Sequence, residues 1–398
     1  MNCHGGMMRR WLKIIGIIVA LVLIAGVGFF FFGLAGIVEG RMNAVRQLPP
    51  YTVSERAAAL HKTLTVADLH ADSLLFGRDL NKKASSAQVD VPRLIEGNVT
   101  LQVFSVVSKT PKGLNIEHND ANSDNITTIA IANRWPIKAW TSLKERALYQ
   151  ASRLKAFAAA SDGRLVIVEN KRDLAAFLEK RKSNPNMVAG VLALEGAQVL
   201  EGDPANVGTL FDAGYRMMAP THFFDTEMGG SAHGMQKGGL TEAGREMIRQ
   251  MEERHMIVDI AHASMTTIDD ILAMATRPVV VSHTGVKGTC DNNRNLSDDQ
   301  LRAIAAKGGL IGIGLWDTAV CGTDAAATAK AQKYVAELIG VSHVANGSDF
   351  DGAVTTPFDV SGMPLLTEAL IADGVSDADI GSIMGGNQIR FLMENLPD

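Results

Sequence analysis

The sequence predicts an α/β protein, a (β/α)8 barrel of the TIM type preceded by one N-terminal transmembrane helix. Three observations support this fold class. The chain has 398 residues, 46% of them hydrophobic and 20% charged, which is enough to bury a large core. An uncharged apolar run lies near its start, and beyond it eight short apolar segments alternate with helical patterns. We therefore expect one membrane helix followed by one large parallel barrel.

The membrane helix is predicted at residues 14–38, which contain no charged side chain. As a helix this run would extend about 37 Å, enough to cross a hydrocarbon core of about 30 Å with some tilt. A cleaved signal peptide is the alternative, although its apolar region is normally shorter, about 7 to 15 residues. Arg9, Arg10 and Lys13 predict a cytoplasmic tail at 1–13, because positive residues stay on the cytoplasmic side. The body is then extracytoplasmic in a single-pass protein, or periplasmic in a bacterium.

Residues 39–55 are predicted to be a juxtamembrane linker, because they lack a sustained apolar period and contain Pro49 and Pro50. The barrel domain is expected over 56–398. Its strands are predicted from short β-branched or apolar runs at 64–70, 99–107, 187–195, 215–222, 256–262, 278–283, 309–316 and 343–349. Alternation of such runs with helices implies parallel pairing.

Helical patterns are found at 126–160, 241–253, 265–275, 297–306 and 325–338. A short extra strand at 165–169 would raise the strand count from eight to nine. A doubly wound open sheet is the alternative architecture, which periodicity does not distinguish from a barrel.

Charge and cysteine content limit the partners and the compartment. The net charge is −5 without a basic stripe, which argues against a nucleic-acid partner. Cys290 and Cys321 lie in the predicted extracytoplasmic body, whereas Cys3 lies in the tail. The count alone is compatible both with one disulfide and with two separate buried thiols.

Ionisable side chains stand at or just beyond the carboxyl ends of six predicted strands. In a parallel barrel these ends meet at one rim, which is where such folds place active sites. The residues are His70, Asp72, Glu195, His222, His262, His283 and Asp349. Each of these residues alone could be an ordinary core or surface residue. Seven of them gathered at one rim instead indicate a functional site.

Nitrogen and oxygen ligands of this kind suit zinc-class cations. Five ligands exceed the three that usually hold one catalytic zinc, so the pattern favours two metals that share Glu195. We interpret the remaining histidines of the body as surface or structural residues: His61, His118, His233, His255 and His343. The sequence contains no Gly-x-Ser-x-Gly elbow and no cysteine in a catalytic pattern, which disfavours a serine or cysteine nucleophile.

The motifs around these residues resemble the membrane (renal) dipeptidase family of binuclear zinc peptidases, within the amidohydrolase-like barrels. The similarity extends from about residue 55 to the end of the chain. Its motifs, in order, are ADLHADSLL, ALEG, THFFDTEMGGSAHG, GLTEAGREMIRQM, IVDIAHAS, VVVSHTG, NNRNLSD, NGSDFDG and GGNQIRFL. Many motifs in a fixed order are far more specific than a single His-x-Asp pair.

The resemblance implies a role for each site residue. His70 and Asp72 would bind one Zn2+, His262 and His283 a second, and Glu195 would bridge them. His222 and Arg294 would hold the scissile carbonyl and the substrate carboxylate, and Asp349 would handle protons or the substrate amine. Family members pair cysteines in the corresponding loops, which favours a disulfide between Cys290 and Cys321. They also often dimerise, so the resemblance implies that this protein could form a homodimer.

The expected activity is hydrolysis of dipeptides by a water molecule that bridges and is acidified by two zinc ions. One alternative keeps the metals but changes the substrate to lactams, esters or other amides. Related barrels of that kind often bridge their metals with a carbamylated lysine, whereas a glutamate stands at this strand end. Another alternative, an inactive metal-stabilised binding module on a membrane, is disfavoured by the intact ligand set with Arg294 and Asp349.

Overall fold

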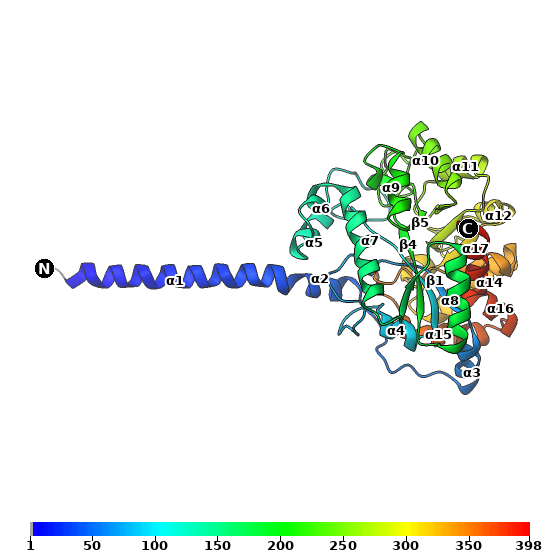
Figure 1. Ribbon diagram of the computed structural model, residues 1–398, viewed down its shortest axis with the longest axis horizontal. Coiled ribbons are helices and arrows are strands. Elements are labelled where there is room, and N and C mark those ends of the chain that lie inside the picture. Colours follow the sequence, from blue (N-terminus) through cyan, green and yellow to red (C-terminus); the bar gives the residue numbers. More distant parts are fainter. Residues whose placement is uncertain (1–2) are drawn as a thin grey trace.

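The computed structural model describes residues 3–398, so the first two residues of the predicted tail lie outside it. Parallel strands form the centre of the body and helices surround them (Figure 1). The strands are β1 (Val66–Ala71), β2 (Val99–Phe104), β3 (Leu165–Ile167), β4 (Val188–Leu194), β5 (Tyr215–Met218), β6 (Ile257–Val258), β7 (Val280–Thr284), β8 (Leu310–Ile313) and β9 (Val344–Asn346).

Eight of the strands in residues 3–398 curl into a closed ring. β1, β2, β4, β5 and β6 pair in that order, as do β7, β8 and β9, and every pairing is parallel. A parallel bridge from Asp259 to Val280 joins β6 to β7, and one from Ala71 to Phe350 joins β1 to the segment that follows β9. The predicted barrel is therefore confirmed, and the open-sheet alternative is wrong because both gaps are bridged.

The extra strand at 165–169 is present as β3, but it lies outside the ring. It pairs with residues 188–190 of β4, at the start of that strand, while β5 pairs with residues 192–194. A three-residue strand at this position leaves the carboxyl end of β4 free to pair with β5. The expected barrel order is thus kept with nine strands in the described chain.

Helices surround the ring. In the body they are α3 (Glu55–Thr63), α4 (Val91–Glu96), α5 (Ile126–Ala132), α6 (Lys138–Thr141), α7 (Leu143–Ala159), α8 (Lys171–Ser183), α9 (Asn206–Asp212), α10 (Glu242–Glu253), α11 (Met265–Met274), α12 (Asp298–Ala306), α13 (Asp317–Val320), α14 (Ala325–Ile339), α15 (Met363–Ala372), α16 (Asp377–Gly381) and α17 (Asn387–Asn395). Short turns of helix are η1 (Ala197–Leu200), η2 (Val341–His343), η3 (Val360–Gly362) and η4 (Ser382–Gly386).

Local capping explains several helix starts. The side chains of Ser264 and Ser297 each accept a hydrogen bond from the third backbone N–H of their helix, and Ser297 forms a full capping box with Gln300. The helical pattern predicted at 126–160 is divided into α5, α6 and α7. Pro136, which lacks an N–H, lies between α5 and α6, and Ser142 caps a new helix by accepting from the Glu145 N–H.

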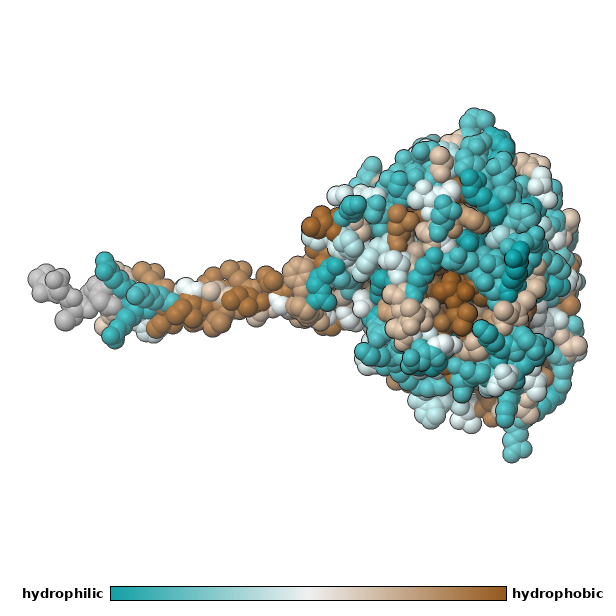
Figure 2. All heavy atoms as spheres, viewed as in Figure 1, coloured by the Kyte–Doolittle hydropathy of each residue, from teal (hydrophilic) through white to brown (hydrophobic). Residues whose placement is uncertain are grey.

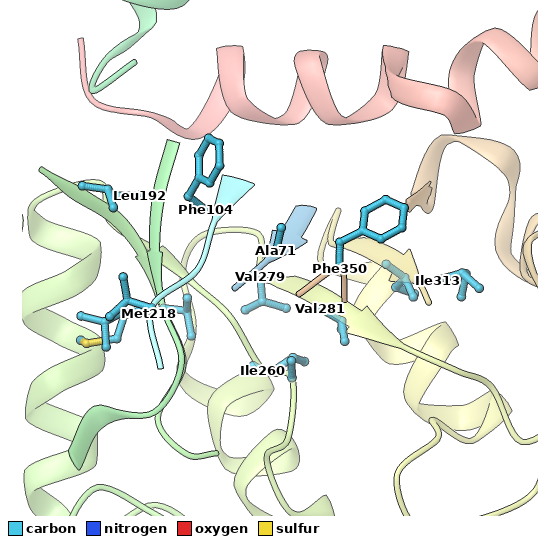
Figure 3. Close-up of a cluster of buried hydrophobic side chains, with 14 of the residues drawn as sticks. Ala71, Phe104, Leu192, Met218, Ile260, Val279, Val281, Ile313 and Phe350 are labelled. Carbon is cyan, nitrogen blue, oxygen red and sulfur yellow. The ribbon is translucent and has the colours of Figure 1, made fainter. Parts of the chain in front are cut away.

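The strands are buried on both faces, as expected of a parallel sheet covered by helices. Neighbouring residues of β4 divide between two apolar clusters: Leu192 belongs to the larger one, whereas Val191 belongs to a smaller one that includes Phe391 of α17. Figure 3 shows part of the larger cluster, in which Phe104 and Met218 lie with residues of the neighbouring strands. This core holds the strand ends that carry the ionisable residues.

The N-terminal segment projects from the body as a helix, α1 (Cys3–Phe32), followed after Gly33 by α2 (Leu34–Met42) (Figure 1). Residues 7–32 are long and apolar enough to cross a membrane. Beyond the hydrophilic side chains near the free end of the helix, its surface is mostly apolar (Figure 2). The run predicted at 14–38 therefore begins in α1 and ends in α2. Glycine has a low helix propensity, which fits the break at Gly33.

The stretch predicted as a linker, residues 39–55, is packed against the barrel over its first half. Val45 forms a parallel bridge with Thr356, whose N–H donates to the carbonyl of Ala44. Asn43 is buried and its side-chain oxygen accepts from the N–H of Ala353. The segment that follows α2 thus packs against the loop that follows β9. This contact joins residues about 310 positions apart in the sequence.

Candidate metal centre

The predicted site residues come from six strand ends and meet at one rim of the barrel. His70 lies in β1 and His283 in β7, while Glu195 directly follows β4. His222, His262 and Asp349 follow β5, β6 and β9 by three or four residues. All six side chains are buried, and the parallel strands place them together because their carboxyl ends share one edge.

The carboxylate of Glu195 occupies the centre of this set. Its Oε1 lies 2.9 Å from His262 Nε2, 3.3 Å from His283 Nε2 and 3.8 Å from His70 Nε2. Its Oε2 lies 3.2 Å from His222 Nε2. The two imidazole nitrogens of His262 and His283 are themselves 2.9 Å apart. One carboxylate is thus surrounded by four imidazoles.

A second group adjoins the first through His70. Its Nε2 lies 3.4 Å from Asp72 Oδ2 and 3.9 Å from Asp349 Oδ1. His70 and Asp72 belong to one strand end, where residues two apart share a face. His70 and Glu195 therefore link two adjoining ligand groups.

Several of these buried atoms have no hydrogen-bond partner in the described part of the chain. They are His70 Nε2, Asp72 Oδ1, Glu195 Oε1, His222 Nδ1 and His262 Nδ1. Buried polar atoms are normally paired, so a cluster of unpaired nitrogens and oxygens indicates a missing partner. Imidazole and carboxylate are ligands of zinc-class cations. Three sets of three residues each bring their ligand atoms within 4.8 Å of one another: His70, Glu195 and His283; Glu195, His222 and His262; and His70, Asp72 and Asp349. The residues present fit a divalent metal.

Burial and neighbouring charge set the electrostatics of the site. Burial raises the pKa of Glu195 far above its ordinary value and lowers the pKa of His262 and His283 well below theirs. Burial acts to lower the pKa of His70 too, but the carboxylates of Asp72 and Glu195 outweigh it and raise the pKa to about 10. A cation would favour the ionised carboxylates and neutral imidazoles that metal binding needs.

Further polar side chains orient the histidines from behind. The Ser282 hydroxyl lies 2.9 Å from His283 Nδ1 and 3.4 Å from His70 Nδ1. The backbone N–H of Ser282 donates to Asp259, and Asp68 accepts from the N–H and the hydroxyl of Ser348. Such partners hold an imidazole in the orientation that a metal requires. The sequence signal for Asp68 and Asp259 is a single charged residue inside an otherwise apolar strand run.

Arg294 approaches the site from the loop after β7. Its Nη2 donates to the carbonyl of His283 at 2.8 Å and lies 3.4 Å from His262 Nε2, and its guanidinium lies 5.7 Å from the Trp316 ring. The side chain is buried, yet in residues 7–398 its hydrogen-bond partners are a carbonyl, a hydroxyl and an imidazole nitrogen, and not a carboxylate. A buried guanidinium of this kind is prepared to bind an anion.

The model of the family described as membrane dipeptidase (peptidase family M19) matches residues 54–396, which include every residue of this site. The chain belongs to the membrane dipeptidase family.

Individual relatives agree with this assignment. Dipeptidase AclJ of Aspergillus oryzae is 32% identical over 219 residues, which are 52% of this chain and 52% of that protein. The match therefore spans about half the length of this relative. A metallopeptidase from Rhodobacter sphaeroides, liganded with a phosphinate mimic of the dipeptide L-Ala-D-Ala, has a TM-score of 0.67 at 22% identity, covering 84% of this chain and 99% of that chain. The probable dipeptidase PvdM from Pseudomonas aeruginosa has a TM-score of 0.70 at 18% identity, covering 86% and 98%. The two structures show that this chain has their fold.

A disulfide joins two loops at the rim of this dipeptidase-family barrel. Cys290 and Cys321, with Cα atoms 5.2 Å apart, connect the loops after β7 and β8. Between them, the side chain of Asn295 donates to the carbonyls of Cys290 at 2.7 Å and Ala319 at 2.9 Å. Arg294 precedes Asn295, so these bonds hold the segment that presents the guanidinium.

His233 lies beside the site, a position that no local sequence pattern predicts. Its side chain is fully buried, its Nδ1 lies 2.7 Å from the carbonyl of Ile116, and its ring centre is 5.1 Å from that of His262. It arrives in the loop after β5, folded back by the hydrogen bond from the His233 N–H to Ser231. The sequence predicts a surface or structural residue here, and burial excludes the surface position. The contact of His233 with His262 depends on how the loop folds.

A cavity of about 690 Å3 opens over the candidate ligands. Asp72, Glu195, Asp349 and Arg294 are among the residues that line it. Its volume is in the range of small-molecule sites, which run from about 300 to 1,000 Å3. The lining also includes three residues of the N-terminal segment: Val38, Met42 and Arg46.

Proposed function

We propose that the protein is a zinc-dependent dipeptidase that hydrolyses the peptide bond of dipeptides at two metal ions. The observation that carries the proposal is the arrangement around Glu195, whose Oε1 lies within 3.8 Å of three imidazole nitrogens in a buried cavity. Membership of the dipeptidase family supports the substrate class.

In this proposal His70 and Asp72, whose Nε2 and Oδ2 atoms are 3.4 Å apart, would hold one zinc ion. His262 and His283, whose Nε2 atoms are 2.9 Å apart, would hold the other, and Glu195 would be shared. When bound, such a pair of ions supplies Lewis-acid polarisation of the scissile carbonyl and a water acidified to a pKa of about 7. The ligands are held in place by Ser282 and by the core beneath the strand ends.

Arg294 and His222 position the substrate. The free N–H groups of Arg294 bind the C-terminal carboxylate, because a guanidinium can bond both oxygens and is here buried without a paired carboxylate in residues 7–398. Burial keeps the pKa of His222 well below its ordinary value, so its neutral imidazole can donate a hydrogen bond to the carbonyl oxygen.

Asp349 handles the proton. Its Oδ1 lies 3.9 Å from His70 Nε2 at the edge of the ligand set, and burial raises the pKa of its carboxyl group, although His70 and Arg294 act to lower it. A carboxyl group with a raised pKa can hold a proton at neutral pH and deliver it to the leaving amine.

The N-terminal helix is proposed to anchor the enzyme in a membrane, with the barrel on the extracytoplasmic side. Its length and the positive residues Arg9, Arg10 and Lys13 before the apolar run support this topology. In sealed vesicles of known orientation, protease should digest the barrel only from the side opposite these residues. Release of an intact barrel after signal cleavage, or digestion from the same side, would contradict the topology.

The test of the proposed activity uses the full chain purified in detergent. Metal analysis should find two zinc ions per chain, and a dipeptide panel that includes L-Ala-D-Ala should be hydrolysed and lose activity with a chelator. Lactam, ester and longer-peptide substrates serve as comparisons. Hydrolysis of one of these in preference to every dipeptide would reject the dipeptidase assignment, and one zinc ion per active chain would reject the paired site.

A further inference from the structure

We infer that the helix α2 is one wall of the substrate cavity, and that Val38 and Met42 limit the size of the side chain on the amine side of the substrate. The inference rests on the proposed dipeptidase function and adds a specificity element that lies outside the barrel. The segment that leads from the membrane helix would then be part of the site as well as a tether.

The first support is the composition of the cavity. Val38, Met42 and Arg46 line the same space as Glu195 and Asp349. Val38 and Met42 are four residues apart, so they lie on one face of α2. Met42 is half-buried and packs against an apolar cluster that includes Leu75, Phe76 and Ile126, which also line the cavity.

A buried chain of charges fixes α2 to the site. Glu39, also on α2, is 5% exposed and accepts from Arg78 Nε at 2.5 Å. Arg78 also bonds to the carboxylate of Asp351, which accepts from the Ser73 hydroxyl at 2.6 Å and from the N–H of Gln88 at 2.9 Å. A carboxylate and a guanidinium that are both buried are costly to separate, because each would be left unpaired.

The chain of charges reaches two of the loops that carry candidate site residues. Ser73 follows Asp72 directly, and Asp351 lies two residues after Asp349. The position of α2 is therefore tied to the edge of the site where Asp349 stands. Arg294, which would bind the substrate carboxylate, lies instead against His283 and His262. We therefore assign the α2 wall to the amine side of the substrate.

The wall is continuous with the apolar helix. Gly33 alone separates α1 from α2, and the guanidinium of Arg134 lies 4.4 Å from the ring centre of Phe32 at the end of α1. Beyond α2, the bridge between Val45 and Thr356 holds the chain to the loop after β9. Contacts on both sides of α2 thus keep it over the cavity, and its removal would open the amine side to solvent.

The experiment compares full-length variants in detergent on dipeptides with alanine at the C-terminal position and Gly, Ala, Leu or Phe at the N-terminal position. Met42→Ala and Val38→Ala should raise kcat/KM for Phe-Ala relative to Ala-Ala by roughly tenfold or more, since a single methylene group in a hydrophobic pocket is worth about 10- to 200-fold. Met42→Trp should lower the same ratio. The matched control is Ile37→Ala, because Ile37 lies on the same helix but is exposed and does not line the cavity.

The outcomes separate this inference from the proposed function. If the wild type hydrolyses dipeptides but the ratio changes less than twofold in Met42→Ala and Val38→Ala, the α2 wall is rejected and the dipeptidase activity stands. A second series of dipeptides keeps alanine at the N-terminal position and varies the C-terminal residue. If the two variants change relative kcat/KM only in this second series, the α2 wall is rejected as well. If the wild type hydrolyses no dipeptide, the proposed function fails, and hydrogen exchange decides whether α2 is docked. Amides of residues 39–47 should exchange slowly in the wild type and faster in Glu39→Ala, and fast exchange in the wild type rejects the wall.

Discussion

Two candidate site residues, His262 and Asp349, have backbone φ angles of +60° and +62°. Residues other than glycine rarely adopt this left-handed conformation, and where they do the surrounding structure holds them in it. Asparagine tolerates it better than most residues, which makes Asp349→Asn a conservative probe of the carboxyl group. The backbone conformation and the side-chain volume should both survive this change.

Asp349→Asn is expected to lower kcat by about 10²- to 10⁴-fold, the usual range for a lost proton-transfer group. Metal content and melting temperature should stay close to the wild type, because the other ligands are retained. Steady-state kinetics with metal analysis checks this. Full kcat with both metals bound would remove Asp349 from the mechanism, and loss of a metal would make it a ligand.

His61 provides a pH-dependent contribution to stability away from the site. It is buried, with Nδ1 2.7 Å from the Thr367 hydroxyl and Nε2 3.0 Å from the carbonyl of Gly97, and burial lowers its pKa. Below about pH 6.5 the unfolded chain takes up a proton that the folded chain resists, so stability is complete above that pH and falls as the pH falls.

The melting temperature of His61→Gln should therefore depend less on pH between 5 and 8 than that of the wild type. Comparing the two proteins removes effects that they share, such as the release of metal in acid. Parallel curves for the two proteins across this range would contradict the assignment.

At the scale of elements, the disulfide and the loops it joins position Arg294. The bond closes a segment with a sequence separation of 31, for which loop-closure entropy predicts roughly 3 to 4 kcal/mol of stabilisation. The loops after β7 and β8 otherwise depend on side-chain to carbonyl hydrogen bonds such as those of Asn295.

Replacing both cysteines, Cys290→Ser with Cys321→Ser, should lower the melting temperature and raise KM more than it lowers kcat. The reason is that, in the proposed mechanism, the guanidinium of Arg294 binds the substrate and does not take part in proton transfer. Kinetics and thermal unfolding of the double variant test this. An unchanged KM together with a lower melting temperature would limit the disulfide to a structural role.

For the whole molecule, the rim of the barrel and the N-terminal segment are at the same end. The cavity is lined both by strand-end residues and by α2, while α1 leaves the body as a separate helix (Figure 1). In the proposed membrane topology, the mouth of the site therefore lies near the membrane surface. Substrates would reach it from the space between the body and the bilayer.

Removing the metals should destabilise the whole barrel, because the unpaired atoms of the site come from strands on opposite sides of the ring. A ligand that binds only the folded state at 100 times its Kd contributes about 2.7 kcal/mol. Chelation should then lower the melting temperature by several degrees in the wild type and by less in His262→Ala. An equal melting temperature with and without chelator would argue against these ligands.

Local patterns in the sequence were sufficient for the barrel and for most of the site. The strand-end positions of His70, Glu195 and Asp349 could be predicted, because parallel strands in any such barrel bring their carboxyl ends to one rim. An uncharged run likewise predicts an apolar helix without knowledge of its surroundings.

Other features depend on contacts between distant residues, which no local pattern contains. The proline-containing stretch after the apolar run reads as a linker, but Asn43 and Val45 find partners more than 300 positions away and dock there. A charged residue such as Glu39 is expected at the surface from its type alone, but in the folded chain it is buried and paired with Arg78. The burial of His233 beside His262 depends in the same way on how one loop folds back. Strand ends follow from chain geometry that all such barrels share, whereas the wall over the cavity depends on pairings that form only when the chain is folded.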